Sequence, residues 1–391
     1  MRQPGEANTR SGAAEPAGST AEPAGSKSEL ARLRAEIDRI DRVLLAALNE
    51  RARQVQEIGR IKADSGLEIY SAARERDLLE GLRRSNPGPF PEAAIEPVFR
   101  EIISATRSLE GPLRVAFLGP EGTYSHLAAR RHFGDAATLT PTATIGDVFH
   151  AVELGQVELG VVPVENTTEG VVTRTLDALA DAEVTICGEV LLRISHHLLS
   201  RSGKLEDVRR VASIGQALAQ CRVWLERHLA HAERVETAST AAAAQLAAEN
   251  PGVAAIGSAL AGEAYGLAVI EAGIEDRRDN TTRFLLLGRS APPRSGNDLT
   301  CAVFTVRKAQ SGALHRLLEP FARLGVNLTS IQSRPMPGKP FEYLFYLDVE
   351  GHREDERVAR ALADAAAQAH SHRVLGSFPR ALAAPAAGEG R

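Results

Sequence analysis

The N-terminal part of the chain carries a hydrophobic pattern that repeats every seven residues. The repeat runs from Leu30 to Ile61 and is interrupted at Arg51, where the next aliphatic side chain is expected. It predicts one long helix whose apolar stripe is covered by partner helices of the same domain or of a second copy. The apolar members are Leu30, Leu33, Ile37, Ile40, Leu44, Ile58 and Ile61.

Two shorter helices are predicted to complete an all-helical unit. Ser26-Lys27-Ser28-Glu29 has the form of a capping box and marks the expected start of the long helix. After a break at Gly66, the pattern predicts helices from Ala72 to Arg84 and from Glu92 to Glu110. Gly111-Pro112 then ends the unit.

Two cations lie on nearly the same face of the long helix. Lys62 lies eleven residues beyond Arg51, which is about three helical turns. The residues alone leave two interpretations open. Arg51 snorkels from the edge of the stripe, or inward-pointing cations with no acid in their row await an anionic ligand.

From Leu113 to about Arg289 the pattern changes to alternating strands and helices, which predicts an α/β domain. The apolar run 113–118 precedes Gly119-Pro120-Glu121-Gly122-Thr123-Tyr124-Ser125, and a helix follows to Phe133. The N–H groups of such a helix start could bind a small carboxylate or could simply be capped by a hydroxyl. No dinucleotide or triphosphate fingerprint is present.

Several other strand-to-helix joins of this domain also place Ser, Thr, Asn or Gly at a helix start. One of them, after Val211-Ala212-Ser213, leads into a predicted helix from Gln216 to Leu225. Together they suggest a cleft between two lobes that binds an anion-rich small molecule. The segment Asn280-Thr281-Thr282-Arg283-Phe284 precedes a predicted strand and adds hydroxyls, an amide and an arginine to the same cleft.

The C-terminal part predicts a third domain. Strands and helices follow one another as βαββαβ, which is the ferredoxin-like α+β order. We therefore predict a tail over residues 1–26, an all-helical domain over 27–111, an α/β domain over 112–290, a linker over 291–298, an α+β domain over 299–379 and a second tail over 380–391.

The composition excludes some classes of function. The 391 residues are 43% hydrophobic and 25% charged with a net charge of -4, so neither nucleic acid nor an anionic membrane is an expected partner. No signal segment or membrane-spanning run is present in the sequence, so we expect a cytoplasmic protein. Cys187, Cys221 and Cys301 are far apart, which predicts reduced thiols and no zinc site. We expect no metal or organic cofactor.

The N-terminal helical unit resembles the all-helical chorismate mutase family. The resemblance rests on 33–41, Asn49-Glu50-Arg51, Ile58-Gly59-x-x-Lys62 and Arg74-Glu75. It implies an intertwined dimer in which Arg34 of the partner chain, Arg51 and Lys62 hold the carboxylates and the ether oxygen of chorismate. The remaining implied site residues are the catalytic Glu75 and Glu110 and the substrate-binding Ser71, Arg74 and Thr106.

Two residues depart from that family. Ser71 stands where some members have an aspartate, and Glu110 stands where some have a glutamine that donates to the ether oxygen. A carboxyl group donates only when it is protonated, so we expect mutase activity to fall as the pH rises and Glu110 ionises. The alternative is a helical domain that has lost its activity.

The α/β domain is similar to prephenate dehydratase, whose fold is two-lobed and resembles periplasmic binding proteins. The resemblance rests on 119–125, Val162-Pro163-Val164-Glu165-Asn166-Thr167, Ser213, Gln220-Cys221 and Thr282-Arg283-Phe284. It implies that Thr282 assists the loss of the hydroxyl, with Asn166 and Gln220 also catalytic. The implied substrate contacts are Thr123, Tyr124, Ser125, Glu165, Thr167, Ser213 and Arg283, although Arg283 could equally be a structural clamp.

The C-terminal domain resembles the phenylalanine-binding ACT domain that follows this dehydratase. The implied effector residues are Gly312, Ala313, Leu314, Asn327, Leu328, Thr329, Ser333 and Arg334, while His315 and Gln332 depart from the usual pattern. Together the resemblances imply an enzyme, a homodimer or homotetramer, that converts chorismate to prephenate and then phenylpyruvate under inhibition by L-phenylalanine. A solute-binding or regulatory protein without chemistry is the competing class, and arogenate is an alternative dehydratase substrate.

Overall fold

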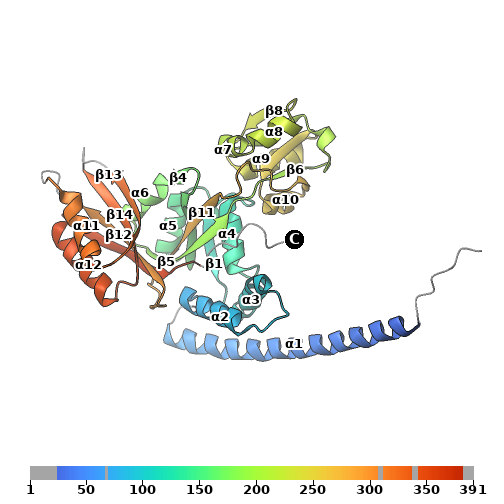
Figure 1. Cartoon of the computed structure of the whole chain (residues 1–391), viewed down its shortest axis with the longest axis horizontal. Helices are drawn as coiled ribbons and strands as arrows, with labels where there is room; N and C mark the ends of the chain where they lie inside the picture. The colour runs from blue at the N-terminus through green and yellow to red at the C-terminus, as the bar shows by residue number, and fades with distance from the viewer. Residues whose placement is uncertain (1–23, 67–68, 307–310, 337–341, 382–391) are drawn as a thin grey trace, which may run out of the picture. The chain divides into compact units, whose positions relative to one another are not determined.

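A computed structural model of the chain describes residues 24–66, 69–306, 311–336 and 342–381 (Figure 1). The part of the chain up to Gln54 belongs to one compact unit, and the chain from Val55 onward forms a second. Residues 1–23 and 382–391, which make up most of the two predicted tails, lie outside the described residues.

The predicted long helix is present as α1, Ala24–Ser65, and is continuous in Figure 1. It begins before the predicted capping box and inside the segment predicted to be a tail. Its surface carries Glu–Arg pairs three residues apart, such as Glu36–Arg39, which favour the helix. The apolar stripe is exposed in the single chain, with Ile37 and Leu44 each 57% exposed.

Two further helices follow, α2 (Ala72–Ser85) and α3 (Glu92–Arg107). The predicted end of α3 at Glu110 is wrong by three residues. The chain turns there because the N–H groups of Leu109 and Glu110 bond the carbonyls three residues back, at Thr106 and Arg107.

The first lobe of the α/β domain contains a six-stranded sheet in the order β2-β1-β3-β11-β5, with β4 paired to β3. Strands β1, β2 and β3 are parallel, whereas β11 runs antiparallel to both β3 and β5. Its elements are β1 (Arg114–Leu118), α4 (Tyr124–Phe133), β2 (Thr138–Thr142), α5 (Ile145–Glu153), β3 (Leu159–Asn166), β4 (Gly170–Val171), α6 (Thr173–Asp181), β5 (Thr185–Arg193) and β11 (Thr281–Gly288).

The second lobe lies between β5 and β11 in the sequence and has its own five-stranded sheet, β10-β6-β9-β7-β8. The predicted helix from Gln216 to Leu225 is two helices that meet at Cys221. The elements are β6 (His197–Ser200), η1 (Leu205–Asp207), β7 (Arg210–Ser213), α7 (Gly215–Gln220), α8 (Arg222–His228), β8 (Glu233–Glu236), α9 (Thr240–Glu249), β9 (Val253–Gly257), α10 (Ala259–Tyr265) and β10 (Ala268–Glu271).

The C-terminal domain has the predicted βαββαβ order, and its sheet is β13-β14-β12-β15. One face packs on the two helices through Phe304, Leu317 and Phe321. The other face packs on the first lobe, and a Cβ at Gly376 of β15 would lie 2.1 Å from the Ile186 carbonyl oxygen of β5. The elements are β12 (Asp298–Thr305), α11 (Ala313–Arg323), β13 (Leu328–Pro335), β14 (Tyr343–Glu350), α12 (Glu356–Gln368) and β15 (Ser371–Pro379).

The multidomain fold class predicted from the sequence is therefore confirmed. Cys187, Cys221 and Cys301 are buried and free. Across the described ranges, no helix has the length and apolar character needed to cross a membrane. The same ranges hold no cluster of His, Cys, Asp or Glu suited to a metal ion.

Candidate functional site

Two predicted catalytic residues of the α/β domain meet on neighbouring strands. Thr282, near the start of β11, pairs in register with Asn166, at the end of β3. The Asn166 amide donates to Thr282 Oγ1 at 2.8 Å and to Asn280 Oδ1 at 2.7 Å. Thr282 and Asn280 are 8% and 4% exposed.

The second lobe supplies the third predicted catalytic residue. Gln220, the last residue of α7, accepts from Asn280 Nδ2 through its Oε1 at 3.0 Å. Its own amide nitrogen donates to Glu169 Oε1 at 3.3 Å. Polar side chains from both lobes therefore form one connected group at this site.

This arrangement leaves Thr282 able to act as a hydrogen-bond donor. The hydroxyl oxygen already accepts from Asn166, so its single proton can be directed to a ligand. A hydroxyl donor among oriented amides suits the protonation of a leaving group.

His196 also belongs to this group, although none of the motifs quoted above includes it. His196 is 3% exposed, and its Nε2 lies 2.9 Å from Gln220 Oε1. Its Nδ1 lies 2.8 Å from the hydroxyl of Tyr124, which also donates to the Ser195 carbonyl. The adjacent pair His196-His197 was the signal available in the sequence.

The predicted anion-binding bend at 119–125 is used for packing between the lobes. Thr123 caps α4 by accepting from His126 N, and Ser125 is buried. The Ser258 hydroxyl, at the start of α10, donates to the Gly122 carbonyl at 3.0 Å. The hydroxyl cap is therefore observed at this bend, and carboxylate binding there stays a prediction.

Two more predicted substrate contacts use their hydroxyls within the protein. Ser213 is fully buried and donates to the Ile256 carbonyl at 2.8 Å. Thr167 accepts from Thr281 N at 3.0 Å and contacts the Asp279 carbonyl. Both side chains support the segments around the site.

Arg283 has the contacts expected of a structural clamp, and its role as a substrate contact stays a prediction. Because side chains alternate along a strand, it points away from its neighbour Thr282. Its guanidinium pairs with Glu189 at 2.7 Å and with Asp348 of β14 at 2.5 Å. Glu165 also lies on this side, because it lines a cavity of about 30 Å³ with Arg283 and Asp348.

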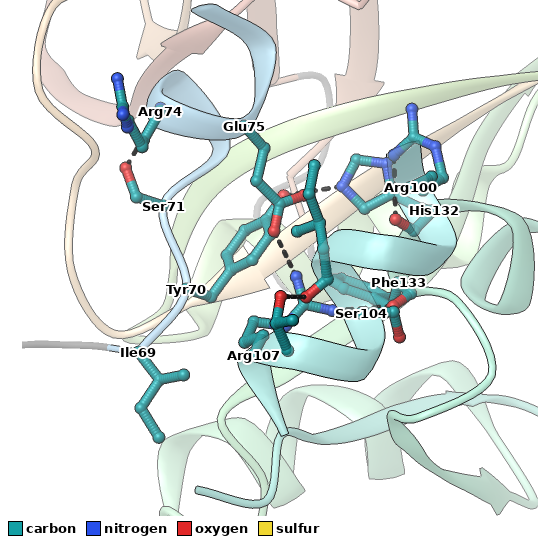
Figure 2. Close-up of polar contacts among 12 residues, drawn as sticks. Ile69, Tyr70, Ser71, Arg74, Glu75, Arg100, Ser104, Arg107, His132 and Phe133 are labelled. Carbon is teal, nitrogen blue, oxygen red and sulfur yellow. Dashed lines mark hydrogen bonds and ion pairs between the residues drawn. The ribbon is translucent and has the colours of Figure 1, made fainter. Parts of the chain in front are cut away.

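In the helical domain, the predicted catalytic Glu75 pairs with Arg107 of α3 (Figure 2). Arg107 is 6% exposed, lies over the rings of Tyr70 and Phe133, and donates to the Phe133 carbonyl at 2.7 Å. Since Phe133 ends α4 of the first lobe, one buried cation holds Glu75 and the neighbouring domain together.

The same contact includes a buried hydrogen bond between Tyr70 and His132, at 2.7 Å (Figure 2). Burial raises the pKa of Tyr70 and lowers the pKa of His132, so the hydroxyl donates to a neutral imidazole. Arg100 donates to the His132 carbonyl at 2.9 Å and, with Arg107, further lowers the pKa of that histidine.

Lys62 has an acid partner, which comes from outside the row of the long helix on which the interpretation was based. Its ammonium lies 2.7 Å from Glu110 Oε2 and also donates to the Ile69 carbonyl. A Cβ at Gly59 would lie 2.9 Å from Glu110 Cα. The absence of a side chain at Gly59 therefore leaves room for the turn that carries Glu110. The pair places a carboxylate beside the cation predicted to bind substrate.

The remaining predicted mutase residues occupy separate positions. Ser71 caps α2 by accepting from Arg74 N, and the Arg74 side chain is exposed. Thr106 is buried and donates to the Ile102 carbonyl at 2.7 Å. On α1, Arg34 is exposed and Arg51 is half-buried.

The predicted effector residues lie at the start of α11 and along β13, the outer strand of the C-terminal sheet. Arg334 also reaches the first lobe, where it forms an ion pair with Asp177 of α6 at 2.8 Å. The Thr329 hydroxyl contacts the Asp348 carbonyl at 3.3 Å. The other members are Gly312, Ala313, Leu314, Asn327, Leu328 and Ser333.

Three family models match the chain in the predicted order. They are chorismate mutase type II over residues 33–111, prephenate dehydratase over 115–292 and the ACT domain over 303–367. A bifunctional chorismate mutase/prephenate dehydratase of Aquifex aeolicus is 45% identical over 349 residues, covering 88% of this chain and 96% of the relative. The chain belongs to the bifunctional chorismate mutase/prephenate dehydratase family.

Other comparisons agree with this family. The Pseudomonas aeruginosa bifunctional chorismate mutase/prephenate dehydratase is 41% identical over 351 residues, with the same coverage of 88% and 96%. The crystal structure of a prephenate dehydratase from Arthrobacter aurescens in complex with L-Phe has a TM-score of 0.65 at 38% identity, covering 70% of this chain and 94% of that one. As a member of the chorismate mutase/prephenate dehydratase family, this chain is an enzyme with mutase, dehydratase and ACT domains.

Proposed function

We propose that the two activities of the family reside in separate parts of this chain. Residues 27–111 rearrange chorismate to prephenate, and residues 112–290 convert prephenate to phenylpyruvate. Residues 299–379 bind L-phenylalanine and inhibit the enzyme. The observation that carries the dehydratase assignment is the hydrogen bond from Asn166 to Thr282, which orients the hydroxyl as a donor.

In the proposed dehydration, Thr282 donates to the hydroxyl of prephenate as it leaves. The electron pair of the breaking bond to the ring carboxylate moves into the ring, and CO2 departs. The leaving hydroxide takes up a proton from the solvent and becomes water, so Thr282 keeps its own proton. Gln220 and Asn166 orient the reacting groups. Arg283 has no direct part, because it pairs with Glu189 and Asp348.

Substitution at position 282 tests this assignment. Thr282→Val removes the donor at nearly constant volume, so we expect prephenate turnover to fall on the order of 10²–10⁴-fold. Thr282→Ser keeps the hydroxyl and should retain most of the activity. Chorismate consumption by the same proteins is the internal control and should not change. A Val variant as active as the Ser variant would exclude Thr282 as the donor.

For the mutase, the proposed site combines Arg51, Lys62 and Glu75 with Arg34 of a second copy. A pericyclic rearrangement needs no nucleophile, only a compact conformer of the substrate and charge against the breaking bond. The exposed apolar stripe of α1 supports a partner copy, since such a surface is normally covered. We therefore propose a homodimer or a higher homo-oligomer.

Supplying the purified protein with chorismate tests both activities together. We expect phenylpyruvate to form and L-phenylalanine to suppress it. Prephenate accumulating alone would remove the dehydratase assignment, whereas turnover of prephenate but not chorismate would mean an inactive helical domain. Turnover of neither would favour a binding protein. Parallel assays with arogenate decide the dehydratase substrate.

A further inference from the structure

The dehydratase site holds a buried histidine that the proposed chemistry does not use. His196 lies between β5 and β6, in the first of the two segments that join the lobes. It contacts Tyr124 of the first lobe through Nδ1 and Gln220 of the second lobe through Nε2, at 2.8 and 2.9 Å. One imidazole thus joins a residue of each lobe.

The hydrogen-bond pattern assigns a proton to Nε2 of this ring. Gln220 Nε2 faces the carboxylate of Glu169, so the Gln220 oxygen is turned toward His196 and Asn280. An amide oxygen only accepts, and therefore His196 Nε2 donates. The single Tyr124 proton goes either to the Ser195 carbonyl or to Nδ1: Nδ1 accepts it in the neutral ring, and in the charged ring Nδ1 donates to the Tyr124 oxygen while that proton goes to Ser195. The contact with Gln220 is the same in both states.

The second segment between the lobes holds Gln220 as well. Asp276 N donates to the Gln220 carbonyl at 2.8 Å, and Asn280 Nδ2 donates to its side-chain oxygen. The two segments are also tied to each other, because Glu275 Oε2 accepts from His196 N at 2.8 Å. With His196 and Asn280 donating to one oxygen, the amide of Gln220 has one orientation.

We propose that His196 is a positioning residue of the dehydratase reaction. Its Nε2–H fixes the Gln220 amide, and Asn280 links that amide to Asn166 and so to the Thr282 hydroxyl. His196 does not contact Thr282, so its effect passes through Gln220. The inference rests on the proposed dehydratase function of this site and adds a residue that the family motifs quoted above do not include.

A double-mutant cycle tests the proposal on the full-length protein with prephenate as substrate. His196→Leu should lower kcat/KM by roughly 30-fold, as expected when a catalytic group is misplaced by a fraction of an ångström. In a Gln220→Ala background the same change should have almost no further effect, because the residue through which it acts is gone. Wild-type activity of His196→Leu, or losses that multiply in the double variant, would overturn the proposal.

A pair of polar variants tests the positioning role of His196 if His196→Leu does not fold. His196→Gln can place an N–H donor where Nε2 lies, whereas the shorter side chain of His196→Asn cannot reach Gln220. We expect the Gln variant to stay within about threefold of wild type and the Asn variant to lose activity like His196→Leu. Equal activities of the two variants would contradict the positioning role.

His197→Leu is the matched control. His197 is the adjacent half-buried histidine, and its Nδ1 has no hydrogen-bond partner among the described residues. We expect the dehydratase activity of His197→Leu to be unchanged, and a loss equal to that of His196→Leu would overturn the proposal.

Thr282→Val separates the positioning role of His196 from the proposed dehydratase function. If that variant is fully active, the proposed function fails; if it is inactive while His196→Leu is not, only the positioning role fails.

Discussion

At the scale of single residues, the Lys62–Glu110 pair decides the charge that a mutase substrate would meet. The ammonium is 23% exposed and the carboxylate 10%, so solvent screens their interaction only in part. A carboxylate in this position offsets the charge that would attract chorismate, and while it is ionised it has no proton to donate.

We therefore predict that Glu110→Gln increases mutase activity at neutral pH. The amide removes the negative charge from Lys62 and adds an N–H donor, so kcat/KM for chorismate should rise on the order of tenfold. Measuring chorismate consumption at neutral pH checks this, with the exposed Glu92→Gln as control. An unchanged or lower rate would mean that Glu110 supports the site as a carboxylate.

The sequence motifs predicted polar residues that the fold brings together, but not the direction of every side chain. Thr282, Asn166 and Gln220 are connected through Asn280, and their catalytic roles stay predictions. The role of Arg283 depends on Asp348, which lies 65 residues away in another domain. His196 was missed because its partners, Tyr124 and Gln220, come from different lobes.

At the scale of elements, β11 joins the dehydratase site to the ACT domain. Thr282 points to one side of the strand, and the adjacent Arg283 pairs with Asp348 on the other. Asp348 lies on β14, which pairs with β13, the strand that carries predicted effector residues. A displacement of β14 would therefore act through the Asp348–Arg283 pair on β11, the strand that positions Thr282.

We predict that Asp348→Ala lowers stability and weakens inhibition by L-phenylalanine. Removing one partner of a buried pair is expected to cost about 2–3 kcal/mol here, below the usual 3–5 because Glu189 remains. Urea unfolding measures the first effect, and dehydratase inhibition curves measure the second. The exposed Glu356→Ala in the same domain is the control. Normal inhibition in a destabilised Asp348 variant would show that the effector signal bypasses this pair.

The ends of elements were harder to predict than their existence. Helix α3 stops at Arg107 because the next residues form tighter turns, and the predicted helix 216–225 breaks at Cys221, where the backbone leaves helical geometry. Neither position has a glycine or proline that would have predicted the end of the helix. Backbone hydrogen bonds that compete over a few residues decide such boundaries.

At the scale of the whole molecule, the contacts between domains were not predictable from motifs that each describe one domain. The cluster of Tyr70, Arg107 and His132 joins the helical domain to the first lobe, and Arg334 joins the ACT domain to α6. Sequence patterns marked the apolar faces that require covering, but not the polar residues that fix their register.

The buried His132 predicts a pH dependence of stability. An unfolded histidine has a pKa near 6.5, whereas burial keeps the folded one neutral to a much lower pH. Below pH 6.5 the unfolded state therefore binds more protons, and the free energy of unfolding falls by up to about 1.4 kcal/mol per pH unit for this group. Above pH 6.5 the contribution is fully present.

Urea unfolding at pH 5.5, 6.5 and 7.5 measures this dependence. His132→Gln should flatten the slope below pH 6.5, although it lowers stability at neutral pH by losing the fit to Tyr70. The exposed His150→Gln should keep the wild-type slope. Identical slopes for the three proteins would exclude His132 as the titrating group.

The stripe of α1 predicts that mutase activity depends on assembly. Leu44→Glu places a charge within the apolar surface that we propose a second copy covers, so the oligomer should dissociate and mutase activity should fall at least tenfold. Dehydratase activity on supplied prephenate should remain. Sedimentation and the two assays check this, with Gln56→Glu as the exposed control. An intact oligomer without mutase activity would place the interface elsewhere.

The central position of β11 has a consequence for synthesis on the ribosome. The strand lies between β3 and β5, yet the whole second lobe is translated before it. Until Gly288 has emerged, β3 and β5 each lack their shared neighbour, and their unpaired edges are open to other chains. The second lobe, which is continuous from His197 to Glu271, is free to fold first. The second lobe can thus be complete on the nascent chain while the first lobe still lacks its central strand, β11.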